Sequence, residues 1–202
     1  MTTLDLMLRP AAPEDAAALA AFAEHVFRDT FGPHNRPEDM DAYCSAAFSL
    51  AELQREIAAP YLHTVLGLAG GEIAGYAQLR TGPPPDCVTG PDPIELKRLY
   101  VARRWHGTSV AKTLMTHAVE LALQRGAQTL YLSVWQHNHR AIAFYARHGF
   151  ERVGAAPFQL GADIQLDPIM MRPLDRTGDD VRRPADSRTS CPPAGQSDPQ
   201  AR

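Results

Sequence analysis

The residues best suited to chemistry stand where a predicted strand, 94–101, is followed by a short loop and a predicted helix, 108–124. Residues at the helix start are small, so backbone N–H groups without an intrahelical acceptor can approach a bound group closely. The helix dipole favours an anion there, which makes this junction a candidate phosphate-binding site. A plain tight turn has a similar composition, and the sequence contains neither a P-loop nor a G-x-G-x-x-G motif. The candidate anion-binding residues are Arg104, His106, Gly107, Thr108, Ser109, Val110 and Ala111.

Hydrophobic patterning predicts the elements that must position this junction. Strands are predicted at 4–8, 61–68, 73–79, 94–101, 129–134, 150–153 and 164–171. Helices are predicted from 13 onward, at 38–47, at 49–59, at 108–124 and at 138–147. Ser49 and Glu52 have the spacing of a capping box, and Pro10 is expected to end the first strand because proline cannot donate to a ladder. This order predicts an α/β domain on one central mixed sheet.

Two segments of the sequence resemble the GNAT (Gcn5-related) N-acetyltransferases. The loop Arg104-Trp105-His106-Gly107-Thr108-Ser109 is similar to the R/Q-x-x-G-x-G/A motif that binds the coenzyme A pyrophosphate in that family, with Ser109 replacing the last Gly or Ala. The segment 138–150 is similar to the family's N-x-x-A-x-x-F-Y-x-x-x-G-F. The resemblance implies an α/β (α+β) GNAT fold, in which a central mixed, mostly antiparallel sheet is flanked by helices and its strands splay around the coenzyme A site.

The resemblance also implies acetyl transfer from acetyl-CoA, as cosubstrate, to an amine, so we expect an acyltransferase. In this reaction Tyr145 would donate a proton to the leaving thiolate, and Glu95 would take the proton of the amine, directly or through water. A packed aromatic side chain and a surface carboxylate are the alternatives for these two residues. Because Glu95 precedes Val101 by six positions, we expect both side chains on one face of the strand.

Further contacts with coenzyme A follow from the same resemblance. Asn138 would contact the pantetheine arm, although asparagine at this position is also typical of a helix N-cap. The strand would offer cofactor-binding groups at Leu99, Tyr100 and Val101. The histidines lack the spacing of a metal site, so no metal is expected.

The acceptor amine is less well defined by the sequence. The helices at about 13–58 would line the acceptor side, and their acids could attract a polyamine: Glu24, Asp29, Glu38, Asp39, Asp41, Glu52 and Glu56. The loop at 31–32, the helix from Ser49 and the closing segment 158–170 resemble the PaiA-type spermidine/spermine acetyltransferases. We therefore expect a small-molecule amine such as a polyamine, with a protein or peptide N-acetyltransferase and a non-catalytic acetyl-CoA-binding regulatory module as alternatives.

Composition places limits on the remaining properties. The 202-residue chain carries a formal net charge of −3, which gives no reason to expect a nucleic-acid partner. The N-terminus does not resemble a secretory signal and no apolar run is long enough to span a membrane, so we expect a cytoplasmic protein. The expected domain is 1–175, followed by a polar, disordered tail at 176–202. A homodimer, common in the resembled family, is compatible with the sequence.

Overall fold

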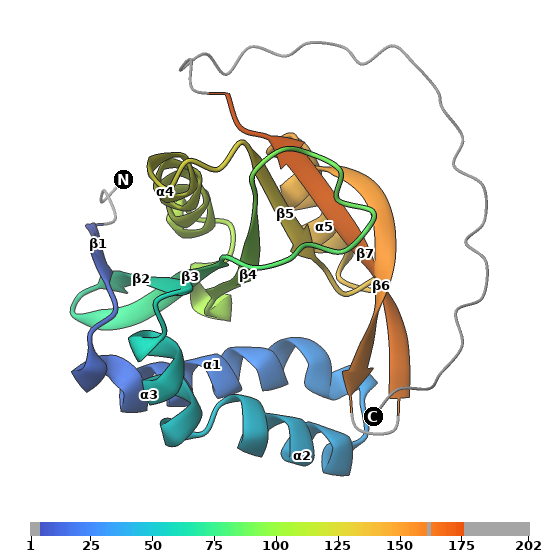
Figure 1. Cartoon of the computed structure of the whole chain (residues 1–202). Coiled ribbons are helices and arrows are strands. Elements are labelled where there is room, and N and C mark those ends of the chain that lie inside the picture. Colours follow the sequence, from blue (N-terminus) through green and yellow to red (C-terminus); the bar gives the residue numbers. More distant parts are fainter. Residues whose placement is uncertain (1–4, 161–162, 176–202) are drawn as a thin grey trace.

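The computed structural model describes residues 5–160 and 163–175 (Figure 1). The strands are β1 Leu6–Pro10, β2 Leu62–Ala69, β3 Glu72–Arg80, β4 Pro93–Val101, β5 Thr129–Ser133, β6 Glu151–Leu160 and β7 Asp163–Pro173. The α-helices are α1 Ala16–Phe31, α2 Pro37–Ala47, α3 Leu50–Ala58, α4 Val110–Gln124 and α5 His139–Arg147. Short 3-10 turns lie at Pro13–Asp15, Gly32–His34 and Arg103–Trp105.

The strands form one sheet in the order β1-β2-β3-β4-β5-β7-β6. Every neighbouring pair is antiparallel except β4 and β5, which are parallel and are connected through α4. These two strands pair only at 93–95 and 129–131, although β4 continues to Val101 and β5 to Ser133. Beyond this point they diverge, so the predicted mixed, mostly antiparallel sheet with splayed strands is confirmed.

Helices cover both faces of the sheet (Figure 1). On one face, α1, α2 and α3 pack against a core that contains Leu66, Leu68 and Tyr76. On the other face, α4 and α5 contribute Leu114, Met115 and Tyr145 to a second core. The close approach of α4 to β3 requires a glycine at 75, because a Cβ there would lie 2.7 Å from the Tyr100 carbonyl oxygen and 2.9 Å from Leu114.

The predicted elements agree with the structure in type and differ at several boundaries. Ser49 caps α3 as predicted, because its hydroxyl accepts a hydrogen bond from the Glu52 N–H. The first strand ends at Pro10 as predicted, although it extends past the predicted Leu8 and Pro10 itself still pairs with Val65, which an edge strand tolerates. The strand predicted at 150–153 begins at Glu151 and extends to Leu160, because it pairs with β7 along its length. The predicted positions of Leu4 and of the tail at 176–202 lie outside the described residues.

The strand that carries Glu95 contains a β-bulge. Glu95 stands opposite Arg80 and Val101 stands opposite Gly75, so the seven residues 95–101 of β4 face the six residues 75–80 of β3. The extra residue is Lys97, between the pairs formed by Leu96 and Arg98. The prediction that Glu95 and Val101 share a face is therefore wrong, because one extra residue reverses the alternation of a strand.

Candidate active site

A cavity of about 720 Å³ opens where β4 and β5 diverge, between α1, α4 and α5. Most of the residues predicted from the sequence to bind the cofactor or take part in catalysis line this cavity, although they come from three separate segments of the chain. The predicted site residues that line it are Glu95, Leu99, Tyr100, Val101, His106, Gly107, Thr108, Ala111, Asn138 and Tyr145. Three predicted residues, Arg104, Ser109 and Val110, are not part of its wall.

The glycine loop and the start of α4 form one end of the cavity. Gly107 has a φ of +79°, a left-handed conformation that glycine adopts without steric cost. It turns the chain from the 3-10 turn at Arg103–Trp105 towards α4, while the Thr108 hydroxyl donates to the Trp105 carbonyl, 2.7 Å away. The Ser109 side chain does not cap α4, and the Val110 N–H makes one long hydrogen bond, at 3.4 Å, to the Thr108 hydroxyl. The first N–H groups of α4 therefore remain suited to an anionic ligand.

Arg104 lies apart from this loop. Its guanidinium forms an exposed ion pair with Glu72, at 2.7 Å, and lies over the Trp105 ring. Ser109 is exposed at the N-cap of α4, and Val110 is fully buried in the core under that helix. The structure does not bring the side chains of Arg104, Ser109 and Val110 into the cavity. Their contacts with the cofactor stay predictions.

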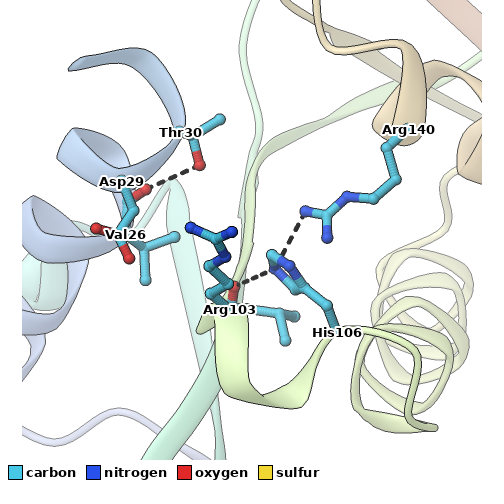
Figure 2. Close-up of a pocket in the computed structure, with 7 residues that line it drawn as sticks. Val26, Asp29, Thr30, Arg103, His106 and Arg140 are labelled. Atoms are coloured by element: carbon cyan, nitrogen blue, oxygen red, sulfur yellow. Dashed lines mark hydrogen bonds between the residues drawn. The ribbon is translucent and has the colours of Figure 1, made fainter. Parts of the chain in front are cut away.

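Basic side chains that the sequence analysis did not single out also line the cavity. Lys112 lies in the first turn of α4, and Arg140 and Arg147 lie near the two ends of α5. Figure 2 shows Arg140 beside His106, and the two side chains are 3.1 Å apart. Arg103 joins them around an adjoining space of about 220 Å³. Lys112 and Arg140 had a signal in the sequence, because they lie near the N-termini of α4 and α5, where cations and free N–H groups together favour phosphate, whereas Arg147 is the last residue of α5 and had no such signal.

His106 links the loop to β4. Its Nε2 lies 2.9 Å from the Val101 carbonyl oxygen (Figure 2). Burial, and then the charge of Arg140, lower the pKa of His106 below its ordinary value. A neutral ring is favoured near neutral pH, so His106 orients the end of β4 and does not add a positive charge.

Tyr145 lies on α5, where it is buried between Phe144 and Phe150 and reaches the cavity wall. Burial raises the pKa of Tyr145 above its ordinary value, so its hydroxyl keeps its proton at neutral pH. Asn138 caps the same helix, since its Oδ1 accepts a hydrogen bond from the Ala141 N–H at 3.1 Å. The N-cap role of Asn138 is confirmed, and the residue also borders the cavity.

Two carboxylates line the cavity. Glu95 is ion-paired with Arg80, whose Nε lies 2.5 Å from Oε2 of Glu95. Asp167 is buried on β7, and its Oδ1 accepts a hydrogen bond from the Gln136 N–H at 3.3 Å. Burial raises the pKa of Asp167. Asp167 had no signal in the sequence as a site residue, because its position depends on how the last hairpin packs beside β5.

The far end of the cavity is aromatic. Ring contacts run from Tyr43 to Phe27 at 4.7 Å, from Phe27 to Phe31 at 4.4 Å and from Phe31 to Trp135 at 5.1 Å. Phe158 closes this wall beside Tyr43. The rings come from α1, α2, β6 and the segment after β5, so only the folded chain brings them together.

Two further findings concern the described residues alone. None of their helices combines the length and the apolar character needed to cross a membrane. Nor do they contain a group of three His, Cys, Asp or Glu side chains placed to hold a metal ion.

The chain is similar to known acetyltransferases along most of its length. The profile of the acetyltransferase (GNAT) family matches residues 20–150. An uncharacterised N-acetyltransferase of Lactobacillus delbrueckii subsp. lactis is 31% identical over 80% of this chain and 93% of its own. An uncharacterised N-acetyltransferase of Mycobacterium tuberculosis (strain H37Rv) is 34% identical over 79% of this chain and 98% of its own. The crystal structure of PaiA N-acetyltransferase from Thermoplasma acidophilum with coenzyme A shares the fold, with a TM-score of 0.70, 20% identity, and coverage of 84% of this chain and 99% of that one.

Proposed function

Because the chain belongs to the GNAT family of acetyltransferases, we propose that it transfers an acetyl group from acetyl-CoA to the primary amine of a small molecule held in the cavity. One observation carries this proposal. The diverging ends of β4 and β5 open onto a cavity that has the glycine loop and the start of α4 at one end and Tyr145 and Glu95 in its wall.

The residues present fit acetyl-CoA. Backbone N–H groups at Gly107 and at the start of α4 suit the pyrophosphate, and Lys112 and Arg140 add positive charge beside them. The free edge of β4 at Leu99 and Val101 suits the pantetheine amides, because β5 has already turned away from it. Bound there, acetyl-CoA supplies a thioester whose acetyl group is open to an attacking amine.

The catalytic roles follow from the protonation states that the site favours. The amine must lose a proton as its nitrogen bonds to the thioester carbon, and Glu95 is the proposed acceptor of that proton, directly or through water. The sulfur leaves as the C–S bond breaks, and the Tyr145 hydroxyl is the proposed donor of its proton. The raised pKa of Tyr145 ensures that this proton is present at neutral pH.

The position of the acidic residues relative to the cavity indicates which kind of amine the site can attract. Of the acids on the N-terminal helices, five are ion-paired with arginine or lysine: Glu24, Glu38, Asp41, Glu52 and Glu56. None of the seven acids considered in the sequence lines the main cavity. A polyamine therefore gains no support from these acids, and the proposal specifies a small-molecule amine.

The test is a thiol-release assay with purified protein, acetyl-CoA and a panel of spermidine, spermine, amino acids, aromatic amines and short peptides. We expect turnover with at least one small-molecule amine and a loss of turnover in Tyr145→Phe. Turnover confined to peptides would instead favour protein or peptide acetylation. Acetyl-CoA binding without turnover on any acceptor would contradict the proposed catalysis.

A further inference from the structure

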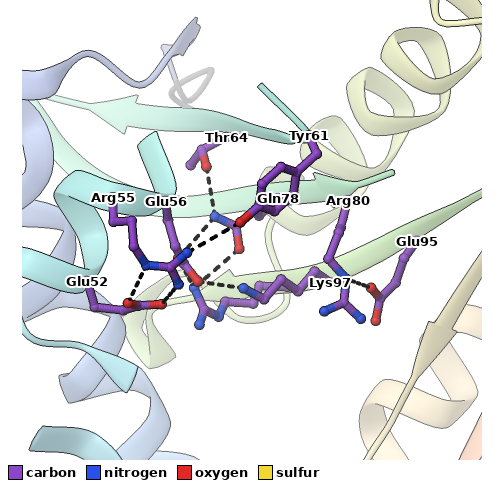
Figure 3. A network of polar contacts seen from close by, with 10 residues as sticks. Glu52, Arg55, Glu56, Tyr61, Thr64, Gln78, Arg80, Glu95 and Lys97 are labelled. Carbon is purple, nitrogen blue, oxygen red and sulfur yellow. Dashed lines mark hydrogen bonds and ion pairs between the residues drawn. The ribbon is translucent and has the colours of Figure 1, made fainter. Parts of the chain in front are cut away.

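The β-bulge of β4 places two neighbouring cations beside one buried carboxylate. Lys97 Nζ lies 2.5 Å from Oε1 of Glu56, which is 1% exposed on α3 (Figure 3). Arg98 Nη1 lies 2.5 Å from Oε2 of the same carboxylate. A regular strand would send consecutive side chains to opposite faces, so the bulge is what brings both to the same carboxylate. One negative charge facing two positive charges leaves one positive charge without an acidic partner in this group.

Arg98 is the deeper of the two cations. Its side chain is 8% exposed, stacks over Phe48 at 5.3 Å and lines the cavity. Its bonds to Glu56 and to the Gln78 amide oxygen, at 2.5 and 3.2 Å, both leave from Nη1. Gln78 is itself fixed by Thr64, 3.0 Å away. A guanidinium has donors on three nitrogens, so Nε and Nη2 retain donor capacity beyond these two bonds, and the buried Tyr76 hydroxyl also lies within reach of the guanidinium.

The surroundings of Arg98 are aromatic. Tyr43, Phe27 and Phe158 line the same cavity and contact one another through their rings. Trp135 lines it as well, and its Nε1 is buried without a hydrogen-bond partner among the described residues. Such a wall favours a flat or large apolar group, and its low polarity strengthens the attraction between a buried guanidinium and an anion.

The acids of the cavity do not cancel the charge of Arg98. Glu95 is paired with Arg80, and Asp167 lies on β7, where it accepts from the Gln136 N–H. On these observations, and resting on the proposed function, we infer that the acceptor is an aromatic or large apolar α-amino acid whose carboxylate is bound by Arg98. Lys97 adds charge at the same place, and the aromatic wall receives the side chain of the amino acid.

The first experiment compares phenylalanine with phenethylamine, which differ only in the carboxylate, and includes spermidine as an acceptor without carboxylate or ring. The kcat/KM of the unmodified enzyme is measured with phenylalanine, phenethylamine and spermidine, and rates are expressed per unprotonated amine because the amines differ in pKa. A charge-assisted hydrogen bond predicts that phenylalanine exceeds phenethylamine by about tenfold or more. Equal values, or a preference for phenethylamine or spermidine, would overturn the inference.

The second experiment tests the assignment to Arg98. Arg98→Lys keeps a cation for Glu56 but removes the guanidinium donors, and the double variant Glu56→Gln/Arg98→Gln removes both charges together. In each folded variant the ratio of kcat/KM for phenylalanine over phenethylamine should fall towards one, whereas overall destabilisation would lower both values alike. The control is Arg55→Gln, an exposed arginine on α3 that should leave the ratio unchanged. An unchanged ratio in both Arg98 variants would overturn the assignment.

A binding measurement separates this inference from the proposed catalysis. Phenylalanine and phenethylamine are titrated into the coenzyme A complex by calorimetry, without turnover. If no amine releases thiol but phenylalanine binds at least about tenfold more tightly, the proposed function fails and the carboxylate site stands. If thiol is released but binding shows no preference for the carboxylate, the proposed function stands and this inference fails.

Discussion

The Nε of Arg80 lies 2.5 Å from Oε2 of Glu95, across the β3–β4 ladder at the rim of the cavity. A carboxylate held at Oε2 in this way keeps Oε1 as an acceptor for the amine or a bridging water. We predict that Glu95→Gln lowers kcat by about 10²-fold, because general-base catalysis is removed while the shape is kept. Steady-state kinetics with the best acceptor measure this effect.

The matched control for this prediction is Glu52→Gln, a half-buried carboxylate on α3 that pairs with Arg55 outside the cavity. Its kcat should equal that of the unmodified enzyme. If Glu95→Gln retained full kcat while Asp167→Asn lost it, the proton acceptor would be Asp167.

Tyr145 offers the second test of the chemistry. Tyr145→Phe removes only the hydroxyl, so we predict a loss in kcat of about 10²-fold and an unchanged Kd for acetyl-CoA. Tyr61→Phe is the control, because Tyr61 is exposed before β2 and does not line the cavity. An equal loss in both variants would show that the effect is not specific to the Tyr145 hydroxyl.

The sequence predicted the parts of the site that depend on local signals. The start of α4 and the helix that carries Tyr145 depend on small residues, caps and helical spacing within one segment, and the Asn138 cap was predicted on that basis. The splay of β4 and β5 followed from the family resemblance. These features need no knowledge of distant contacts.

Features that depend on pairing between distant segments were missed. The bulge at Lys97 is visible only in the register with β3, so the face of Glu95 was predicted wrongly. Glu56 counted in the sequence as one of several acids on the acceptor side, whereas the fold buries it against two cations. Asp167 reaches the cavity only through the pairing of β7 with β5 and β6. In each case tertiary pairing, and not local propensity, decides the environment of the side chain.

Gly107 tests the phosphate-binding loop. Alanine at its φ of +79° costs about 1–2 kcal/mol, although a Cβ there would meet no atom within 4 Å. We predict that Gly107→Ala shifts the loop and weakens acetyl-CoA binding about tenfold by calorimetry. Gly71→Ala, at a φ of +84° in the β2–β3 turn, should lose similar stability and keep its affinity. Equal affinities in the two variants would contradict a role for the loop in binding.

The charge of Glu56 should make the free energy of unfolding of this protein depend on pH. We predict that Glu56→Gln lowers the free energy of unfolding by about 3 kcal/mol at pH 7, because Arg98 is left buried without its carboxylate. Urea denaturation measures this loss. Glu52→Gln, half-buried on the same helix and paired with the exposed Arg55, should cost less than about 1 kcal/mol.

The pH dependence of that loss follows from the pKa of Glu56. Burial opposes the charge, but the attraction of Arg98 and the hydrogen bonds from Lys97 and Arg98 outweigh it, so the pKa lies below its ordinary value of 4.5. A carboxyl with a lowered pKa stabilises the fold above its unfolded pKa, and this stability is lost as pH falls through the folded pKa. The difference between the unmodified protein and Glu56→Gln should therefore be constant from pH 7 to about 5 and shrink below about 4.5. A difference that stayed constant into that acidic range would show that the ion pair does not set the stability of this core.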